Sequence, residues 1–351
     1  MKTPIKFFVT FCLFILLVSC SQKNKYENAT FFDMTDFKTT QILNGTILQF
    51  DSIIMKPSQL QIYDTLLITS NLEDQKIFHI FNLNTKRKIG ERISRGQGPE
   101  EMLLPFFIQQ KDSIKIFDMM TSTLFVYTIQ EFVTNPTPNP IRKIKLDIQP
   151  LWSELVLLKN KMIGVSYAPK SPCFLFDENG KKIKDFGSYP VSQIEYTDIE
   201  KVDAFRSILT SNQTNRLAIC HYFTNLIDIY NDNGELIKRL HGPEHFFPHF
   251  KEYKNGDIIG SKPIEKTYKD AFYSPTNVGD EFFVLYNGKL VGSENYNLLA
   301  QQILVFTWEG NPLRILHLDQ GVSRISVDPN QKKIYGISDD PEFHIIEFSY
   351  K

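Results

Sequence analysis

A repeated pattern constrains this chain more than any other feature. In each unit, a run rich in Ile, Phe, Leu, Val and Tyr is followed by a short polar gap, a second apolar run that ends in a turn, and a third run. The six units occupy residues 66–93, 113–147, 155–187, 216–242, 282–319 and a shorter 325–350. Helical periodicity is weak almost throughout, so the pattern predicts short strands.

Turn signals place these strands within four-stranded meanders. Residues 177–180, 231–234 and 308–311 occupy matching positions and contain Gly or Asn, which supply positive φ between antiparallel strands. The runs before these turns fit the third strands of their units. Units of about 40 to 50 residues with such strands are typical of propeller blades. We therefore predict an all-β, six-bladed β-propeller, with a seven-bladed ring or a pair of β-sandwiches as alternatives.

Two segments fall outside the six units. We predict that residues 244–277 form an enlarged connection within or beside the fifth unit. The last unit lacks a fourth strand, and the β-like stretch 29–45 could supply it. Closing the ring in this way would remove sheet edges that otherwise aggregate. Residues 29–351 would then form one propeller domain with an insertion around 244–277.

The N-terminus predicts export. Lys2 and Lys6 flank an almost entirely apolar run at 7–18, which is typical of a signal peptide and too short to span a bilayer. The following Leu-Val-Ser-Cys resembles a bacterial lipobox. This resemblance implies a signal peptide of residues 1–19, with Cys20 as the first mature residue, lipidated on its thiol. An ordinary signal peptide with an incidental Cys is the alternative. Residues 20–28 are polar and predict a short tether.

The composition of the chain without its signal peptide limits the classes of partner that the protein could bind. Removal of residues 1–19 leaves 332 residues with 37 basic and 40 acidic side chains, a formal charge of −3. This balance argues against a nucleic-acid partner. No second apolar run is long enough to span a bilayer. Cys173 and Cys220 lie in apolar β-like runs, which favours two buried free thiols over a disulfide, and no Cys pair has metal-ligand spacing.

One motif occurs twice. Arg-Gly-Gln-Gly-Pro-Glu at 95–100 is echoed by Arg-Leu-His-Gly-Pro-Glu at 239–244, and Gly98 and Gly242 are 144 residues apart, three periods of 48. Both copies follow the last strand-like run of a unit. Since Gly allows a sharp reversal and Pro cannot extend a ladder, the motif predicts a turn between an outer strand and the next inner strand. A phosphate-binding loop is excluded because the glycine spacing, the Lys-Ser/Thr pair and the following helix are all missing.

These connections enter the central strands, where propellers usually bind ligands. We therefore predict that five residues line one face of the ring as candidate ligand-binding residues, namely Arg95, Glu100, Arg239, His241 and Glu244. A local Arg–Glu pair that rigidifies the turn is the alternative for Arg95 and Glu100. The sequence identifies no catalytic residue.

Residues 241–250 contain three histidines that are four positions apart and three phenylalanines. On a helix the histidines would share one face and could bind a metal ion. Pro243 and Pro248 argue against a helix, so we predict no metal site there. The phenylalanines could pack over the ring or stack on a ligand such as a sugar.

The lipobox, the blade period and the Gly-Gln-Gly-Pro-Glu-Glu connection together resemble the six-bladed, TolB-like propeller lipoproteins of Bacteroidetes-type bacteria. The resemblance covers about residues 30–350, and Glu100 stands where members often have a second Gly. It implies a propeller in the bacterial cell envelope, anchored by lipid at Cys20, with the outer membrane as the expected location and the periplasm or the cell surface as the side it faces. It implies no established activity.

The function must be argued separately, because fold alone does not supply it. The sequence favours a binding module for a glycan, a peptide or an envelope protein, with the membrane as partner through Cys20 and no predicted cofactor. The alternative is a metal-dependent hydrolase, lactonase or lyase in the central channel, which could hold Ca²⁺ with Asn, Asp and Glu from several inner strands. A third hypothesis is a sensor or assembly subunit without a small ligand.

The lipidation hypothesis gives the first prediction. Cys20→Ala should leave an unprocessed precursor without lipid label, because the acylated thiol is lost. Metabolic labelling with a fatty acid and gel mobility measure both effects. Cys12→Ala, inside the segment expected to be removed, should be processed and labelled normally. Labelled protein in the Cys20→Ala strain would contradict lipidation at this residue.

Overall fold

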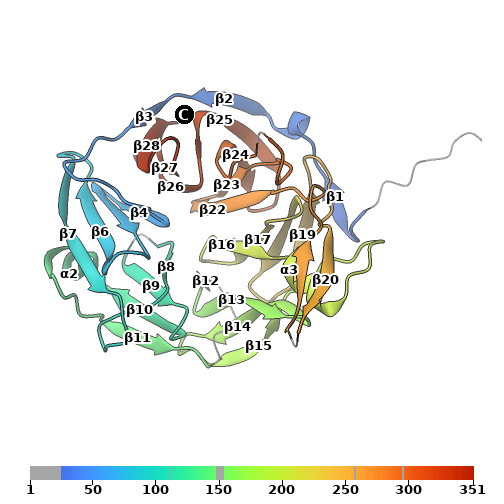
Figure 1. Ribbon diagram of the computed structural model, residues 1–351, viewed down its shortest axis with the longest axis horizontal. Coiled ribbons are helices and arrows are strands. Elements are labelled where there is room, and N and C mark those ends of the chain that lie inside the picture. Colours follow the sequence, from blue (N-terminus) through green and yellow to red (C-terminus); the bar gives the residue numbers. More distant parts are fainter. Residues whose placement is uncertain (1–24, 111, 148–153, 257, 295) are drawn as a thin grey trace, which may run out of the picture.

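The structure is a computed structural model that describes residues 25–110, 112–147, 154–256, 258–294 and 296–351. It confirms the six-bladed β-propeller, with four-stranded antiparallel blades arranged in a ring (Figure 1). The predicted signal peptide and Cys20 lie outside the described residues. In each blade the first strand lies at the centre of the ring and the fourth lies toward the rim.

The first three blades follow one another along the chain. Blade 1 contains β4 (Gln59–Tyr63), β5 (Leu66–Ser70), β6 (Lys76–Asn82) and β7 (Arg87–Ser94). Blade 2 contains β8 (Pro105–Ile108), β9 (Ile114–Asp118), β10 (Thr123–Tyr127) and β11 (Arg142–Lys145), with helix α2 (Ile129–Thr134) before β11. Blade 3 contains β12 (Leu155–Leu158), β13 (Lys161–Ala168), β14 (Ser171–Asp177) and β15 (Lys182–Phe186).

Blades 4, 5 and 6 follow, and each also pairs with a strand from the N-terminal segment described below. Blade 4 contains β16 (Ser207–Ser211), β17 (Arg216–His221), β18 (Leu226–Asn231) and β19 (Leu236–His241), preceded by helix α3 (Asp198–Ala204). Blade 5 contains β22 (Phe272–Val278), β23 (Glu281–Tyr286), β24 (Ala300–Thr307) and β25 (Pro312–Val322). Blade 6 contains β26 (Arg324–Asp328), β27 (Lys333–Ser338) and β28 (His344–Ser349).

The N-terminal segment runs along the outside of blades 4, 5 and 6 (Figure 1). Strand β1 (Ala29–Phe31) pairs in parallel with β19, and β2 (Thr39–Leu43) pairs in parallel with β25; the 3₁₀ turn η1 (Met34–Asp36) lies between them. Strand β3 (Gly45–Ile47) then pairs antiparallel with β28 and completes blade 6. The predicted closure is thus present, but the closing strand lies at the very end of the expected stretch 29–45, and the rest adds fifth strands to two blades.

Apolar side chains fix this segment to the ring. Phe32 and Phe37 pack edge-on against Phe306 of blade 5, each with ring centroids 5.4 Å apart, and Phe32 is only 3% exposed. Leu43, at the end of β2, is 1% exposed. Ile42 points outward and is 73% exposed. The change from an exposed to a buried side chain between these neighbours is typical of a strand that packs one face against the ring.

The third strands of the blades match the sequence analysis, whereas several first strands do not. The predicted third-strand runs lie in β14, β18 and β24. The first strands β4, β8 and β16 precede the repeat units that the sequence indicated. All of strand β22 except its last residue falls inside the stretch 244–277, where Pro275 and a register shift between Tyr273 and Thr276 interrupt the apolar pattern.

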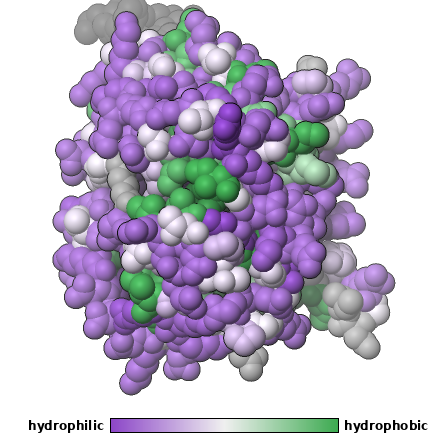
Figure 2. All heavy atoms as spheres, turned by 90° about the vertical axis from the view of Figure 1, so that its left-hand side faces the viewer, coloured by the Kyte–Doolittle hydropathy of each residue, from purple (hydrophilic) through white to green (hydrophobic). Residues whose placement is uncertain are grey.

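The remainder of that stretch forms a hairpin between blades 4 and 5. Strands β20 (Phe250–Asn255) and β21 (Ile258–Pro263) pair with each other only and pack against α3. Cys173 and Cys220 are buried free thiols, as the sequence favoured. Within the described part of the chain, no helix is long and apolar enough to cross a membrane. The outer wall on the side of blades 1 and 2 is mainly hydrophilic, with apolar side chains gathered in small patches (Figure 2).

The packing of the N-terminal segment predicts a contrast between two residues. Phe32→Ala should lower the free energy of unfolding by about 3–5 kcal/mol, because it removes a buried ring and leaves a cavity. Ile42→Ala is the control and should change it by less than about 0.5 kcal/mol. Urea denaturation of both variants measures the difference. Equal effects would show that the segment does not stabilise the ring through its buried face.

Candidate functional site

A central cavity of about 330 Å³ is the candidate functional site. Most of its lining residues come from the first strands of the six blades, β4, β8, β12, β16, β22 and β26, or from positions next to them; Leu72 and Phe117 are the exceptions. Its volume lies at the low end of ordinary small-molecule pockets, roughly 300–1,000 Å³. The cavity can therefore hold one small molecule rather than a polymer.

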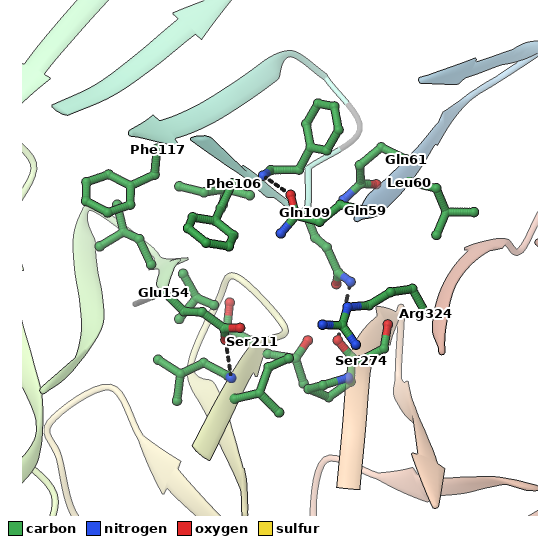
Figure 3. A pocket seen from close by; sticks show the side chains of 18 of the residues that line it. Gln59, Leu60, Gln61, Phe106, Gln109, Phe117, Glu154, Ser211, Ser274 and Arg324 are labelled. Carbon is green, nitrogen blue, oxygen red and sulfur yellow. Dashed lines mark hydrogen bonds between the residues drawn. The ribbon is translucent and has the colours of Figure 1, made fainter. Parts of the chain in front are cut away.

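Two charged side chains reach into this cavity from opposite blades. Glu154 directly precedes β12 of blade 3, and Arg324 begins β26 of blade 6 (Figure 3). One carboxylate oxygen of Glu154 accepts a hydrogen bond from the backbone N–H of Leu209 at 3.1 Å. The guanidinium of Arg324 donates to the carbonyl oxygen of Ser323 at 2.9 Å. Among the described residues no ion pair joins the two, so each retains hydrogen-bonding capacity toward a ligand.

The remaining wall is mixed polar and apolar. The amide oxygen of Gln59 accepts from the backbone N–H of Phe107 at 2.9 Å, while its amide nitrogen has no partner in the described chain. Thr210 lines the cavity, and its buried hydroxyl has no hydrogen-bond partner among the described residues. Phe106 adds an aromatic ring (Figure 3). A few polar groups in a partly apolar cavity are typical of a small-molecule site.

Gln109 spans the axis near the carboxyl ends of the inner strands. It follows β8 of blade 2, and its amide nitrogen donates to the hydroxyl of Thr276 at 3.1 Å in blade 5, on the opposite side of the ring. Its amide oxygen accepts from the backbone N–H of Asn277 at 3.1 Å. The side-chain amide of Gln213 in blade 4 donates to the backbone carbonyl oxygen of Gln109 at 2.8 Å. These bonds place a polar barrier across one end of the channel.

The first copy of the repeated motif, residues 95–100, forms a turn, as predicted. The second copy differs, because residues 239–241 still belong to β19 and the chain then enters the β20–β21 hairpin before it reaches the inner strand β22. Residues 95–104 connect the outer strand β7 to the inner strand β8. The side chain of Glu101 accepts a hydrogen bond from the backbone N–H of Gly98 at 2.9 Å. A Cβ atom at Gly96 would lie 2.0 Å from the same carboxylate, so a side chain here would displace Glu101 from its present position. The loop is held by its own carboxylate.

The predicted ligand-binding residues do not form one cluster. Arg95 and Glu100 are exposed in the turn after blade 1, and Glu100 pairs with Lys143 at 3.5 Å rather than with Arg95. Glu244 follows blade 4, where it pairs with Lys269 and accepts from the Tyr286 hydroxyl at 3.1 Å. The two turns are three blades apart and lie on opposite sides of the ring.

Arg239 and His241 lie in β19, next to the edge strand β1, and both are buried. The guanidinium of Arg239 donates to both carboxylate oxygens of Asp228, at 2.7 and 2.8 Å. Burial opposes ionisation of Asp228, but the hydrogen bonds from Arg239 prevail and lower the pKa of its carboxyl. Burial also lowers the pKa of His241 to about 4. A ligand-binding role for these two residues would require access that their burial excludes.

The neighbouring histidines and phenylalanines are largely structural. The ring of Phe247 stacks on Tyr26 with centroids 4.5 Å apart, and Phe250 joins the same apolar cluster. His245 faces Asp33 at 3.6 Å, whereas His249 is exposed. In the part of the chain that the structure describes, no group of three or more His, Cys, Asp or Glu side chains is arranged to hold a metal ion.

The sequence analysis did not single out Glu154 or Arg324. Each is a charged residue placed directly before the first apolar run of a repeat unit, at 155 and at 325. This position predicts a side chain at the amino end of an inner strand, where it can reach the axis. Only the ring shows that the two residues, from blades 3 and 6, face one space.

Comparisons with known proteins agree with the fold. A family model described as "TolB-like 6-blade propeller-like" matches residues 35–330. No curated protein matches the chain. A solved structure of a DUF4221 family member from Bacteroides vulgatus is similar, with 10% identity, a TM-score of 0.53, and coverage of 94% of this chain and 98% of that one. At this identity the likeness shows the fold alone.

Two other solved structures have lower TM-scores and carry no argument about this chain. The β-propeller domain of Cps50 (Swd1) from Myceliophteria thermophila has 8% identity and a TM-score of 0.46, with coverage of 88% of this chain and 100% of that one. Raptor from Chaetomium thermophilum has 10% identity and a TM-score of 0.47, and the match covers 87% of this chain but only 28% of Raptor.

The environment of Glu154 predicts a pH-dependent stability. Burial raises the pKa of its carboxyl to about 7, against opposing effects of the Leu209 hydrogen bond and the Arg324 charge. The native state therefore keeps a proton that the unfolded chain has lost, so the free energy of unfolding should fall between about pH 4.5 and pH 7. Glu154→Gln removes this titration, and its stability relative to the wild type should rise with pH, by at most about 3 kcal/mol.

Urea denaturation of the wild type and the variant at pH 5 and pH 8 measures this difference. Glutamine retains an acceptor for the Leu209 N–H, so the comparison isolates the charge. Glu178→Gln, in an exposed turn, is the matched control and should show no such trend. A Glu154→Gln effect of equal size at both pH values would contradict the prediction.

Proposed function

Because the chain belongs to the TolB-like six-bladed propeller family, we propose that it is a binding module of the bacterial cell envelope, tethered by lipid at Cys20, that takes a small polar ligand into its central cavity. The central cavity carries this proposal. It receives residues from all six blades and contains Glu154 and Arg324, two charged groups without a mutual ion pair. Desolvated charges are costly unless they find a partner, and a ligand would provide one.

The rigidity of the ring supports a binding role. Inner strands of neighbouring blades pack against one another around the axis. The Gln109 bridge further ties blade 2 to blade 5. A site whose polar groups are held in place loses little conformational entropy when it binds a ligand. Because all six blades meet at the axis, a ligand in the cavity can contact several blades at once.

The N-terminal contacts define how a lipid anchor would hold the ring. Tyr26 is 2% exposed, and its hydroxyl contacts the hydroxyl of Thr224 at 3.1 Å. Tyr26 is only six positions from Cys20, and an extended chain spans at most about 3.6 Å per residue. In the proposed arrangement, lipid at Cys20 therefore keeps the edge of blade 4 within about 20 Å of the bilayer surface.

A ligand screen tests the binding role. Residues 21–351, which contain every described strand, are screened by thermal shift and saturation-transfer NMR against neutral sugars, sugar acids and dipeptides. We expect at least one class to bind with one site per chain. Gln61→Trp, which places a large ring in the cavity wall, should abolish this binding, whereas Lys181→Trp on the surface should not.

Two results would count against the proposal. Binding that is equal in the wild type and in Gln61→Trp would exclude the cavity as the site. A failure of every class to bind would remove the support for a small-ligand module and favour a subunit that contacts other proteins. Circular dichroism and melting curves confirm that both tryptophan variants fold.

A further inference from the structure

We propose that the central cavity is a site for a carboxylated monosaccharide, with the ligand carboxylate on Arg324 and a ring hydroxyl on Glu154. This inference rests on the proposed binding function and specifies its ligand class. The ligand is either a free sugar acid or the terminal uronic-acid residue of an acidic glycan, because both present the same chemistry to the cavity.

The carboxylate is inferred from Arg324. Its guanidinium has one hydrogen bond to the Ser323 carbonyl and no ion pair among the described residues, so several N–H donors are available at the cavity wall. Guanidinium groups bind planar carboxylates in a bidentate manner, with charge-assisted hydrogen bonds. A neutral ligand would leave this guanidinium without a directly hydrogen-bonded carboxylate, because among the described residues no ion pair joins Arg324 to Glu154.

The hydroxyl groups are inferred from Glu154 and from the neutral wall. Glu154 uses one oxygen for the Leu209 N–H and has no partner for the other in the described chain. The hydroxyls of Ser58, Ser211 and Ser274 also line the cavity but are already hydrogen-bonded within the protein. Three other polar groups at the wall have no partner among the described residues, namely the amide nitrogen of Gln59, the side-chain amide of Gln61 and the hydroxyl of Thr210. Such groups donate and accept at short range, as a ligand with several hydroxyls requires. The ring of Phe106 provides an apolar surface on which the C–H face of a sugar can pack.

The size and closure of the cavity limit the ligand to one residue. The volume of about 330 Å³ suits a single sugar rather than an oligosaccharide. The bonds of Gln109 to Thr276 and Asn277 cross the axis, so a glycan cannot thread through the channel. A glycan can therefore present only its terminal residue.

Calorimetric titration of residues 21–351 with D-glucuronate and D-glucose tests the ligand class. The two sugars share the ring and differ in oxidation at one carbon. We expect D-glucuronate to bind with one site per chain and D-glucose to bind at least about tenfold more weakly, the usual effect of losing a charged hydrogen-bonded pair. Arg324→Gln should weaken D-glucuronate binding at least about tenfold and should abolish the preference.

Control variants keep the test specific. Arg324→Lys retains the charge and should retain part of the affinity, whereas Arg87→Gln, at an exposed position in β7, should leave it unchanged. The preference for D-glucuronate over D-glucose is measured on the wild type, so it tests the proposal even if a variant fails to fold. A disaccharide with D-glucuronate at its non-reducing end distinguishes the sources. Binding of the disaccharide indicates a glycan end, and binding of the monosaccharide alone indicates a free sugar acid.

Equal affinities for D-glucuronate and D-glucose, or an unchanged affinity in Arg324→Gln, would overturn this inference. The experiments distinguish a wrong ligand class from a wrong binding function. If another ligand binds and Gln61→Trp blocks it, the binding function stands and the ligand class is wrong. If no ligand binds, both are wrong.

Discussion

The pairing of β3 with β28 is the interaction on which the rest of the structure depends. It joins residues 45–47 to residues 346–348 and so links the two ends of the propeller domain. A Cβ atom at Gly45 would lie 2.5 Å from Ile346 and 2.7 Å from Phe348, so only glycine allows this approach. Without the pairing, blade 6 would have only three strands, and no sheet would hold residues from both ends of the domain. Ring closure therefore fixes the positions of all six blades around the axis.

The candidate site is a consequence of that closure. Glu154 and Arg324 come from blades 3 and 6, and the Gln109 bridge connects blades 2 and 5. Both are relations between opposite blades, which a single blade or an open sheet cannot create. The buried pair of Arg239 and Asp228 has a different role, because it lies in the outer strands of blade 4, away from the axis, and its hydrogen-bonding groups are already paired. Charges that are satisfied within the protein stabilise structure, whereas charges that face a cavity can serve a ligand.

The third strands, which the sequence predicted, and the first strands, most of which it did not, differ in their surroundings. Strands β14, β18 and β24 pack between neighbouring strands, so their residues are apolar and end in recognisable turns. The inner strands are short and face the channel on one side, so Gln59, Gln61, Ser211 and Ser274 interrupt their apolar pattern. The residues nearest to the candidate site were therefore the hardest to assign. The turn after β7 was predicted correctly, but its hydrogen bond from Gly98 to Glu101 depends on a geometry that the sequence does not display.

By itself, the sequence determined the architecture of this protein, because each blade is a local unit. Adjacent strands pair across short turns, and alternating apolar runs with Gly or Asn between them specify such units without long-range information. Only the tertiary structure decided which charged residues share the axis, which of them are buried at the rim, and where the N-terminal segment lies. Those relations join residues more than a hundred positions apart, as with Glu154 and Arg324 or with Gly45 and Phe348. No local pattern records contacts of that kind, because they arise when the ring closes.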